Sequence, residues 1–189
     1  MPDRRPSRHS LTEAIVVGFT GHIGAGKTCA AKYLSSRYGF QYARYSQILR
    51  EWLSPGPADR DRLRTFGWEV MAGGRQVELN ARLIAKLDRS RSAVIDGLRH
   101  MVDYESLSNT FGASFRLIFL DARQDVRFER LRSRFSADEA LQVADAAPVE
   151  AYIDGLKPLS NTTILNEESL ESLYQRLDTW LAALGTEPG

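Results

Sequence analysis

The apolar residues of this chain follow two kinds of pattern. Some form short, nearly unbroken runs, and others recur every three or four positions along more polar stretches. A short run bounded by turn residues predicts a buried strand, and the wider spacing predicts an amphipathic helix. Runs of the first kind occupy residues 15–19, 40–43, 93–96, 115–120 and 162–165. Five buried strands separated by helices predict an α/β fold: one parallel sheet with helices on both faces, in three layers.

The helical stretches alternate with these strands. Gly and Pro at residues 54–57 interrupt one of them, and Gly73-Gly74 ends another. In the last stretch, leucines stand at helical spacing, which predicts a helix packed on the sheet. The predicted helices cover residues 29–34, 46–53, 60–72, 77–91, 125–134 and 170–184.

One loop of the predicted fold carries a phosphate-binding motif. Residues 21–28 read GHIGAGKT and match the pattern G-x-x-x-x-G-K-S/T. They lie between the first predicted strand and the first predicted helix, as the motif requires, and this context disfavours an ordinary glycine-rich turn. The predicted ATP-binding residues of this segment are Gly21, His22, Ile23, Gly24, Ala25, Gly26, Lys27, Thr28 and Cys29.

The chemistry of this motif predicts both a ligand and a metal. Its glycines allow the backbone to approach a ligand closely, and the N–H groups then form an anion cradle at a helix N-terminus. Lys27 is expected to reach the β- and γ-phosphates, and the Thr28 hydroxyl suits Mg²⁺. We therefore expect ATP with magnesium as a cofactor, and Lys27 as a catalytic residue.

Composition limits the other function classes. The length of 189 residues suits one domain, and an apolar share of 43% is enough for a substantial core. The formal net charge of +1 gives no overall electrostatic reason to expect nucleic-acid or membrane binding. The single cysteine, Cys29, excludes an internal disulfide. Of the 25 basic residues, 21 are Arg and four are Lys; Arg suits bidentate phosphate binding, although genomic base composition explains most of such an excess.

The chain shows no targeting or membrane signal. No apolar stretch approaches the ~20 residues that cross a bilayer. Residues 1–10 are basic and polar, contain two prolines and are expected to form a disordered tail. The expected location is the cytoplasm.

Asp96 is the candidate metal-associated carboxylate. It ends an apolar strand, where P-loop proteins place such a group, although Asp96-Gly97 is also a common turn pair. Phosphoryl transfer also requires positive groups around both substrates. The candidate arginines follow or flank predicted strand ends, and the alternative for each is a solvated helix surface. They are Arg50, Arg99, Arg130 and Arg134.

Four further segments and the loop together resemble the nucleoside monophosphate kinase-like P-loop family, which includes adenylate kinases and dephospho-CoA kinases. The loop is most similar to that of dephospho-CoA kinases. The segments follow one another in the family's order over about residues 14–184. They are Tyr45 to Glu51, Ile95 to Arg99, Phe128 to Arg134 and Ile164 to Leu170.

The resemblance implies roles for particular residues. Arg50 and Arg99 would bind the acceptor's phosphate, and Asp96 would lie near magnesium. Arg130 and Arg134 would contact the donor phosphates as catalytic residues, and Asn166 would lie near the donor base. The resemblance also implies a single P-loop kinase domain at 11–189, with an acceptor-binding insertion at about 44–91 and a lid at about 135–149.

The acceptor side contributes more candidates. Arg44 lies beside the acceptor segment, and Arg64 and Trp68 lie in the insertion. Trp68 could stack on a base or belong to the core. Two departures from the family stand out: Ser46 replaces an Asp, and residues 135–149 contain no Arg or Lys.

These observations predict an ATP-dependent phosphotransferase acting on a small phosphorylated acceptor, a nucleoside or deoxynucleoside monophosphate. Three alternatives remain open. The acceptor could be the hydroxyl of dephospho-CoA, with Asp96 as the base. The protein could be a regulatory nucleotide-binding module with slow hydrolysis. It could also phosphorylate a nucleic-acid end, which would need a local basic groove.

Overall fold

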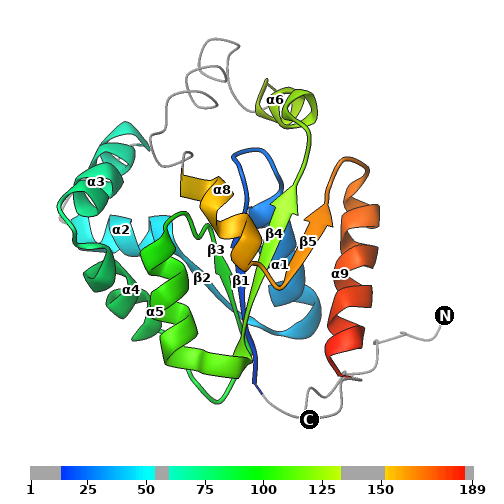
Figure 1. The fold of residues 1–189 in the computed structure, drawn as a ribbon, viewed down its shortest axis with the longest axis horizontal. Helices are drawn as coiled ribbons and strands as arrows, with labels where there is room; N and C mark the ends of the chain where they lie inside the picture. The colour runs from blue at the N-terminus through cyan, green and yellow to red at the C-terminus, as the bar shows by residue number, and fades with distance from the viewer. Residues whose placement is uncertain (1–13, 54–59, 133–151, 186–189) are drawn as a thin grey trace.

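The chain folds around a parallel sheet of five strands, which confirms the predicted class. The computed structural model describes residues 14–53, 60–132 and 152–185. The strands lie in the order β2-β3-β1-β4-β5 (Figure 1), and every neighbouring pair is parallel. Their bounds are β1 (Val16–Thr20), β2 (Gln41–Arg44), β3 (Ala93–Asp96), β4 (Phe115–Asp121) and β5 (Thr162–Leu165).

Helices cover both faces of this sheet. Helices α1 and α9 lie on one face, and α2, α4 and α5 lie on the other, with α8 near the carboxyl ends of the strands (Figure 1). Among the described residues, no helix combines the length and apolar character needed to cross a bilayer. The helices are α1 (Lys27–Tyr38), α2 (Tyr45–Leu53), α3 (Arg60–Ala72), α4 (Gln76–Ile84), α5 (Met101–Phe111), α6 (Gln124–Arg132), α8 (Ile153–Leu156) and α9 (Leu170–Leu184).

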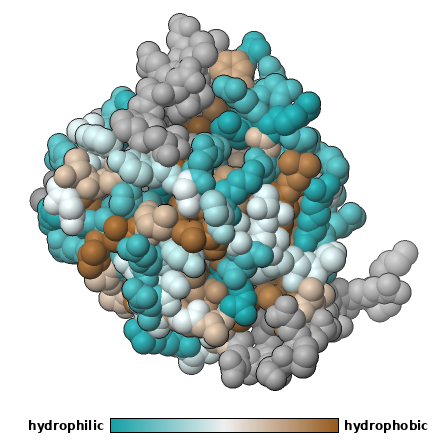
Figure 2. All heavy atoms as spheres, viewed as in Figure 1, coloured by the Kyte–Doolittle hydropathy of each residue, from teal (hydrophilic) through white to brown (hydrophobic). Residues whose placement is uncertain are grey.

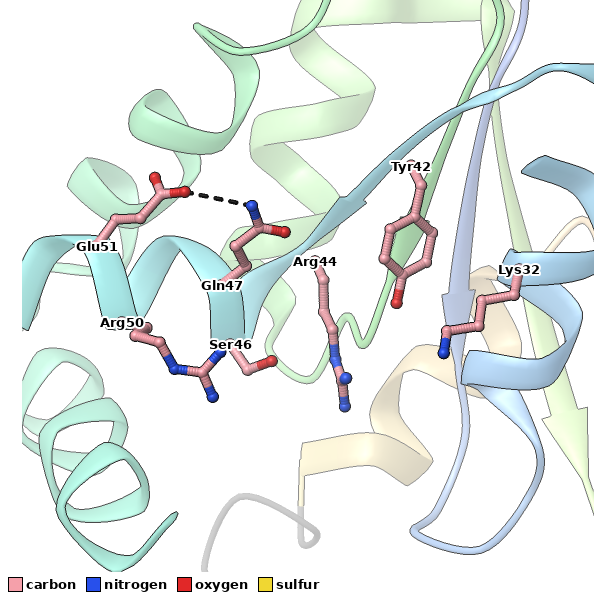
Figure 3. A pocket seen from close by; sticks show the side chains of 7 residues that line it. All are labelled: Lys32, Tyr42, Arg44, Ser46, Gln47, Arg50 and Glu51. Carbon is pink, nitrogen blue, oxygen red and sulfur yellow. Dashed lines mark hydrogen bonds between the residues drawn. The ribbon is translucent and has the colours of Figure 1, made fainter. Parts of the chain in front are cut away.

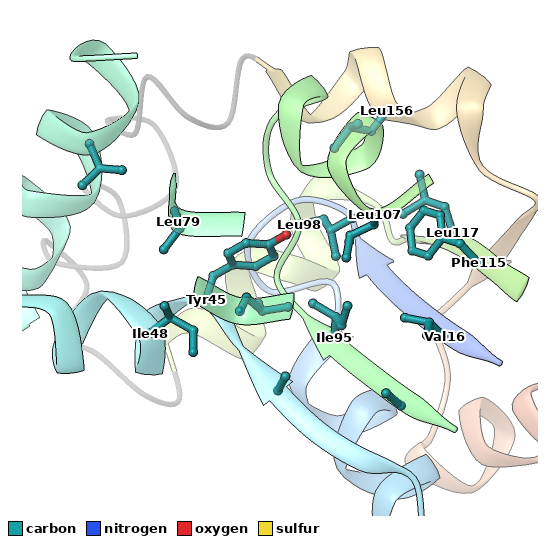
Figure 4. Packing of buried hydrophobic residues seen from close by; sticks show 14 residues of the cluster. Val16, Tyr45, Ile48, Leu79, Ile95, Leu98, Leu107, Phe115, Leu117 and Leu156 are labelled. Carbon is teal, nitrogen blue, oxygen red and sulfur yellow. The ribbon is translucent and has the colours of Figure 1, made fainter. Parts of the chain in front are cut away.

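Alternation along the strands divides the core in two. In β1, Val16 packs with the helices of one face, whereas Val17 and Phe19 pack with α1 and α9 on the other. On the first face Tyr45, at the start of α2, lies beside Leu79 and Leu98 (Figure 4). Each large side chain buried in this way contributes about 1.5–3 kcal/mol. The outer face seen in Figure 2 is mostly hydrophilic, with apolar residues in small groups.

One predicted helix was too long, and one helix of 11 residues was not predicted. The helix predicted over 77–91 ends at Ile84, because the chain then tightens into short turns and Asp88 accepts a hydrogen bond from the Ser90 N–H. Helix α5 was not predicted, because its N-cap residue is His100 and not the usual Ser or Thr. His100 forms a capping box with Asp103, which stabilises the first turn.

The carboxyl ends of the strands meet at one edge of the sheet. Asp96, the last residue of β3, is in register with Phe19 of β1 on one side and with Arg44 of β2 on the other. Parallel sheets of this kind bind ligands outside the carboxyl ends of their strands. The loop after β1, the end of β3 and the start of α2 therefore share one site.

Candidate active site

The loop between β1 and α1 has the backbone geometry of a phosphate cradle. Gly21 and Gly26 have φ values of 130° and 101°, in the region that side chains avoid. A Cβ at Gly21 would lie 2.2 Å from the Leu120 carbonyl oxygen, and one at Gly26 would lie 2.4 Å from Asn166 Nδ2. Both positions therefore require glycine for conformation and for space.

Lys27 begins α1 and folds back over this loop. Its side chain is buried, and its ammonium donates to the backbone carbonyls of Gly21 and His22, the latter at 2.9 Å. The positive charge is thus held inside the loop, where the N-terminus of α1 adds its own partial positive charge. This arrangement suits an anionic ligand.

Three donors converge on a single oxygen of Asp96. Thr28 Oγ1 donates to Asp96 Oδ2 at 2.8 Å, and the Tyr42 hydroxyl donates to it at 2.9 Å. Arg44 Nε lies 3.3 Å from the same oxygen. The Asp96 side chain is almost fully buried. In the described part of the chain these three contacts fall on Oδ2, so Oδ1 is available to bind a metal ion. The Thr28 hydroxyl and the Asp96 carboxylate provide neighbouring oxygen atoms of the kind that bind Mg²⁺.

The Tyr42 hydroxyl orients this carboxylate. Burial, together with the Asp96 charge, raises the pKa of Tyr42 well above its usual value, so the phenol remains a neutral donor. Replacing Tyr42 with Phe is expected to raise the magnesium concentration needed for half-maximal turnover by about tenfold, as expected when a metal ligand loses its orienting partner. The measurement is a magnesium titration of turnover.

A matched variant controls this measurement. Tyr33→Phe also removes a hydroxyl that donates to a carboxylate, that of Asp178, on the opposite side of α1. It should leave the magnesium requirement unchanged. An equal shift in both variants would show that Tyr42 acts through general stability.

The other side of the loop contacts α6 and the turn after β5. Asn166 Nδ2 donates to the Ala25 carbonyl at 2.8 Å, and Arg130 donates to the Asn166 carbonyl at 2.8 Å. Arg127 donates to the Ile23 carbonyl at 3.2 Å, a contact that was not predicted from the sequence. Arg130 and Asn166 therefore lie together at the loop, and their roles toward ATP remain predictions.

A cavity of about 430 Å³ lies beside β2 and α2 (Figure 3), and one of its lining residues, Arg44, is in register with Asp96. The β2 and α2 side chains that line it include Arg44 and Arg50, both predicted acceptor residues. Lys32 of α1 also lines the cavity and was not predicted from the sequence, although it stands one helical turn after Thr28. The lining residues are Lys32, Tyr42, Arg44, Ser46, Gln47, Arg50 and Glu51.

Not every predicted acceptor residue reaches this cavity. Arg64 lies on the α3 surface and pairs with Asp61 at 3.2 Å. Trp68 is 40% exposed on the same helix, which excludes the core alternative, and neither residue lines the cavity. Arg99 stands three residues after Asp96 and is not a lining residue either; its backbone N–H donates to Asp103. Arg134, the lid and the N-terminal tail lie outside the described residues.

A buried polar network supports the acceptor side. Asp103 Oδ1 accepts hydrogen bonds from Gln76 Nε2 at 2.6 Å and Asn80 Nδ2 at 2.8 Å. Its Oδ2 accepts from the backbone N–H groups of Arg99 and His100, both at 3.0 Å. A further bond joins Asn80 to Tyr45, whose pKa burial raises well above its usual value. The network thus connects the start of α2 with the loop after β3.

Replacing Asp103 with Asn is expected to lower the free energy of unfolding by about 3 kcal/mol. Four donors converge on this buried carboxylate, and an amide would present one of its own donors to some of them. Denaturant unfolding measures the loss. Glu105→Gln makes the same chemical change on an exposed position of α5 and should stay within about 0.5 kcal/mol of the parent. Equal stability of the two variants would contradict a supporting role for the network.

Several known proteins are similar to this chain. The family described as AAA domain matches residues 17–147. A UPF0200 protein of Aeropyrum pernix is 30% identical over 168 residues, covering 84% of this chain and 88% of its own. A dephospho-CoA kinase of Methylococcus capsulatus is 27% identical over 201 residues, covering 89% of this chain and 100% of its own.

A further relative and a solved structure are also similar to this chain. Adenylate kinase isoenzyme 1 of Cyprinus carpio is 26% identical over 132 residues, which are 66% of each chain. Among solved structures, shikimate kinase from Acinetobacter baumannii in complex with shikimate has a TM-score of 0.60 at 15% identity. The match covers 96% of this chain and 100% of that one. That last likeness is one of fold.

Proposed function

Because the chain belongs to the AAA domain family, within the nucleoside monophosphate kinase-like group of P-loop proteins, we propose that it is an ATP-dependent phosphotransferase. Its proposed acceptor is a small phosphorylated molecule, a nucleoside or deoxynucleoside monophosphate. One observation carries the proposal. The hydroxyl–carboxylate pair of Thr28 and Asp96 lies between the phosphate loop and a cavity lined by cations, so a donor and an acceptor can meet there.

The phosphate loop is the proposed binding site of the phosphoryl donor, ATP. ATP phosphates would lie in the cradle of residues 21–28, with Lys27 beside the β- and γ-phosphates. Thr28 and Asp96 would hold the metal, directly or through water, and magnesium bound there neutralises charge that develops on the transferred group. Arg130, at the loop, would add a further positive charge on the donor side.

The cavity beside β2 and α2 is the proposed binding site of the acceptor, because positive side chains line it. Arg44 and Arg50 line it, and arginine binds phosphate oxygens through paired donors. Glu51 is the one carboxylate among the described lining residues, and it already pairs with Lys86. The described part of the lining therefore offers a place for an anion and no unpaired carboxylate that could act as a base. A phosphate oxygen needs no strong base, so this favours a phosphorylated acceptor.

Catalysis would then rest on position and charge rather than on covalent chemistry. Lys27 would follow the charge as it moves from the donor to the acceptor, and Arg50 would hold the acceptor phosphate in line. The buried Asp103 network would keep the loop of Arg99 and helix α2 in fixed relative positions. His22, whose Nε2 lies 2.8 Å from Asp154 Oδ1, joins the phosphate loop to α8.

A dephospho-CoA acceptor is the second candidate. The similarity to a dephospho-CoA kinase over that enzyme's whole length favours it. A hydroxyl acceptor would need a base, and Asp96 is the candidate, although it already accepts from Thr28 and Tyr42. A regulatory module would instead hydrolyse ATP slowly without any acceptor.

An acceptor panel tests the proposal. ADP release from ATP and Mg²⁺ is measured alone, then with each ribo- and deoxyribonucleoside monophosphate, and with dephospho-CoA. Strong stimulation by a monophosphate supports the proposal, and stimulation by dephospho-CoA favours the second candidate. Slow turnover that no acceptor changes would contradict both and favour the regulatory module.

Arg50→Ala is expected to raise the acceptor KM by about tenfold or more and to change the ATP KM little. It removes a phosphate-binding cation from the acceptor cavity and leaves the phosphate loop intact. Arg64→Ala removes the same side chain from the surface of α3 and should change neither constant. If Arg50→Ala raised both KM values equally, Arg50 would not be specific to the acceptor.

A further inference from the structure

The positive side chains of the acceptor cavity come from three different elements of the fold. Lys32, Arg44 and Arg50 all line the cavity, on α1, β2 and α2 respectively. Figure 3 shows Arg44 between the other two, with the ends of all three side chains directed toward the same space. The two outer cations thus lie on opposite walls, so they face different parts of a bound molecule.

The three cations differ in what they already contact. Arg44 lies 3.3 Å from Asp96 Oδ2, so its charge is directed partly at the metal-side carboxylate. In the described ranges, neither Lys32 nor Arg50 has a hydrogen-bond or ion-pair partner. Glu51 cannot neutralise Lys32, because it is engaged by Gln47 and Lys86.

An exposed lysine needs no partner, so the position of Lys32 carries the argument. It stands one helical turn after Thr28, on the wall of the cavity across from Arg50 (Figure 3). A volume of about 430 Å³ is in the range that holds a whole small molecule rather than one phosphate group. A phosphate monoester carries about −1.5 to −2 charges at pH 7. Arg50 and Arg44 together supply two positive charges to offset it without Lys32.

We propose that the acceptor carries two separate anionic groups: the accepting phosphate beside Arg50, and a second phosphate bound by Lys32. This inference rests on the proposed function, since it specifies the acceptor of the same site. Lysine suits the second position because its ammonium is a compact point charge on a flexible stem, which binds an anion without fixed geometry.

Calorimetry tests the inference without requiring turnover. The donor loop is saturated with Mg²⁺ and a non-hydrolysable ATP analogue. Adenosine and uridine 5′-monophosphates are then compared with the matching 3′,5′-bisphosphates. The bisphosphate is expected to bind about tenfold more tightly, as one additional charge-assisted contact provides. Lys32→Gln should remove most of this preference, and Lys32→Arg should retain it.

Arg37→Gln provides the matched control, because it removes one positive charge from the same helix outside the cavity lining. The preference should survive in that variant. The inference is overturned if the parent protein shows no preference, if Lys32→Gln keeps it, or if Lys32→Gln weakens only the ATP analogue.

Phosphoryl transfer separates this inference from the proposed function. Transfer to a monophosphate without any bisphosphate preference would overturn the inference alone. A Lys32-dependent preference without transfer to any acceptor would support the two-anion site and contradict the proposed function.

Discussion

Replacing Lys27 with Ala is expected to lower turnover by about 100-fold or more while the protein stays folded. The ammonium is the positive group that the structure holds inside the phosphate loop, bonded to the Gly21 and His22 carbonyls. Loss of one preorganised contact to developing charge costs ~10²–10³ in turnover. Steady-state kinetics with saturating ATP and acceptor measures the loss, and circular dichroism with thermal unfolding confirms the fold.

Lys157→Ala is the matched control for this variant. Lys157 pairs with Asp121 at 2.7 Å, at the end of the neighbouring strand β4, and has no contact with the phosphate loop among the described interactions. Its removal should change turnover less than about twofold, as for an exposed ion pair. Near-normal turnover of Lys27→Ala would contradict phosphoryl transfer at this loop.

Replacing Asp96 with Asn should also lower turnover by about 100-fold or more, with a higher magnesium requirement. The substitution keeps the shape of the side chain but removes the charge beside Thr28. An amide nitrogen at Oδ2 would also face the donors of Thr28, Tyr42 and Arg44. A metal contributes several kcal/mol to phosphoryl transfer, and each 1.36 kcal/mol is a factor of ten in rate.

Asp121→Asn controls for the loss of a carboxylate at the same edge of the sheet. Asp121 ends β4, and its carboxylate contacts Lys157 rather than the Thr28 hydroxyl. The magnesium requirement should remain that of the parent protein. A magnesium titration in which the Asp96 and Asp121 variants behaved alike would remove the metal role from Asp96.

Local signals allowed most of the fold to be predicted from sequence. The strands over 93–96 and 162–165 and the helices over 60–72 and 170–184 have the predicted bounds, because turn residues or glycine pairs delimit clear apolar patterns. Helix α5 lacked such a pattern: it buries Leu107 and Asp103, and its cap uses a histidine. Local capping chemistry, rather than hydrophobic spacing, defines where it begins.

The phosphate loop was predictable because all its parts are adjacent in sequence. The motif and the family resemblance placed Thr28 and Asp96 at one metal site, but the contacts of Asp96 with Tyr42 and Arg44 were not predicted, since they depend on strand order. Placing β3 between β1 and β2 brings Asp96 next to Thr28 on one side and to Tyr42 and Arg44 on the other. No periodicity in the sequence specifies that order. The bonds from Asp103 to Gln76 and Asn80 were missed for the same reason.

The acceptor residues were predicted only in part from the sequence. Family likeness indicated Arg50, which lines the cavity, and Arg99, which does not. Position in the chain indicated Arg44, which lines the cavity, and also Arg64 and Trp68, which lie on the surface of α3. Lys32 was overlooked because a lone lysine on a helix has no distinctive sequence pattern. Its spacing from Thr28 was the available signal.

The destination of the γ-phosphate of ATP tests the central claim most directly. ATP labelled at that position is incubated with Mg²⁺ and the acceptor that stimulates ADP release, and the labelled products are separated and counted. The account predicts one phosphorylated acceptor for each ADP, with the label on the acceptor's phosphate, and loss of this product in Lys27→Ala. Label released entirely as inorganic phosphate, at a rate independent of the acceptor, would contradict it.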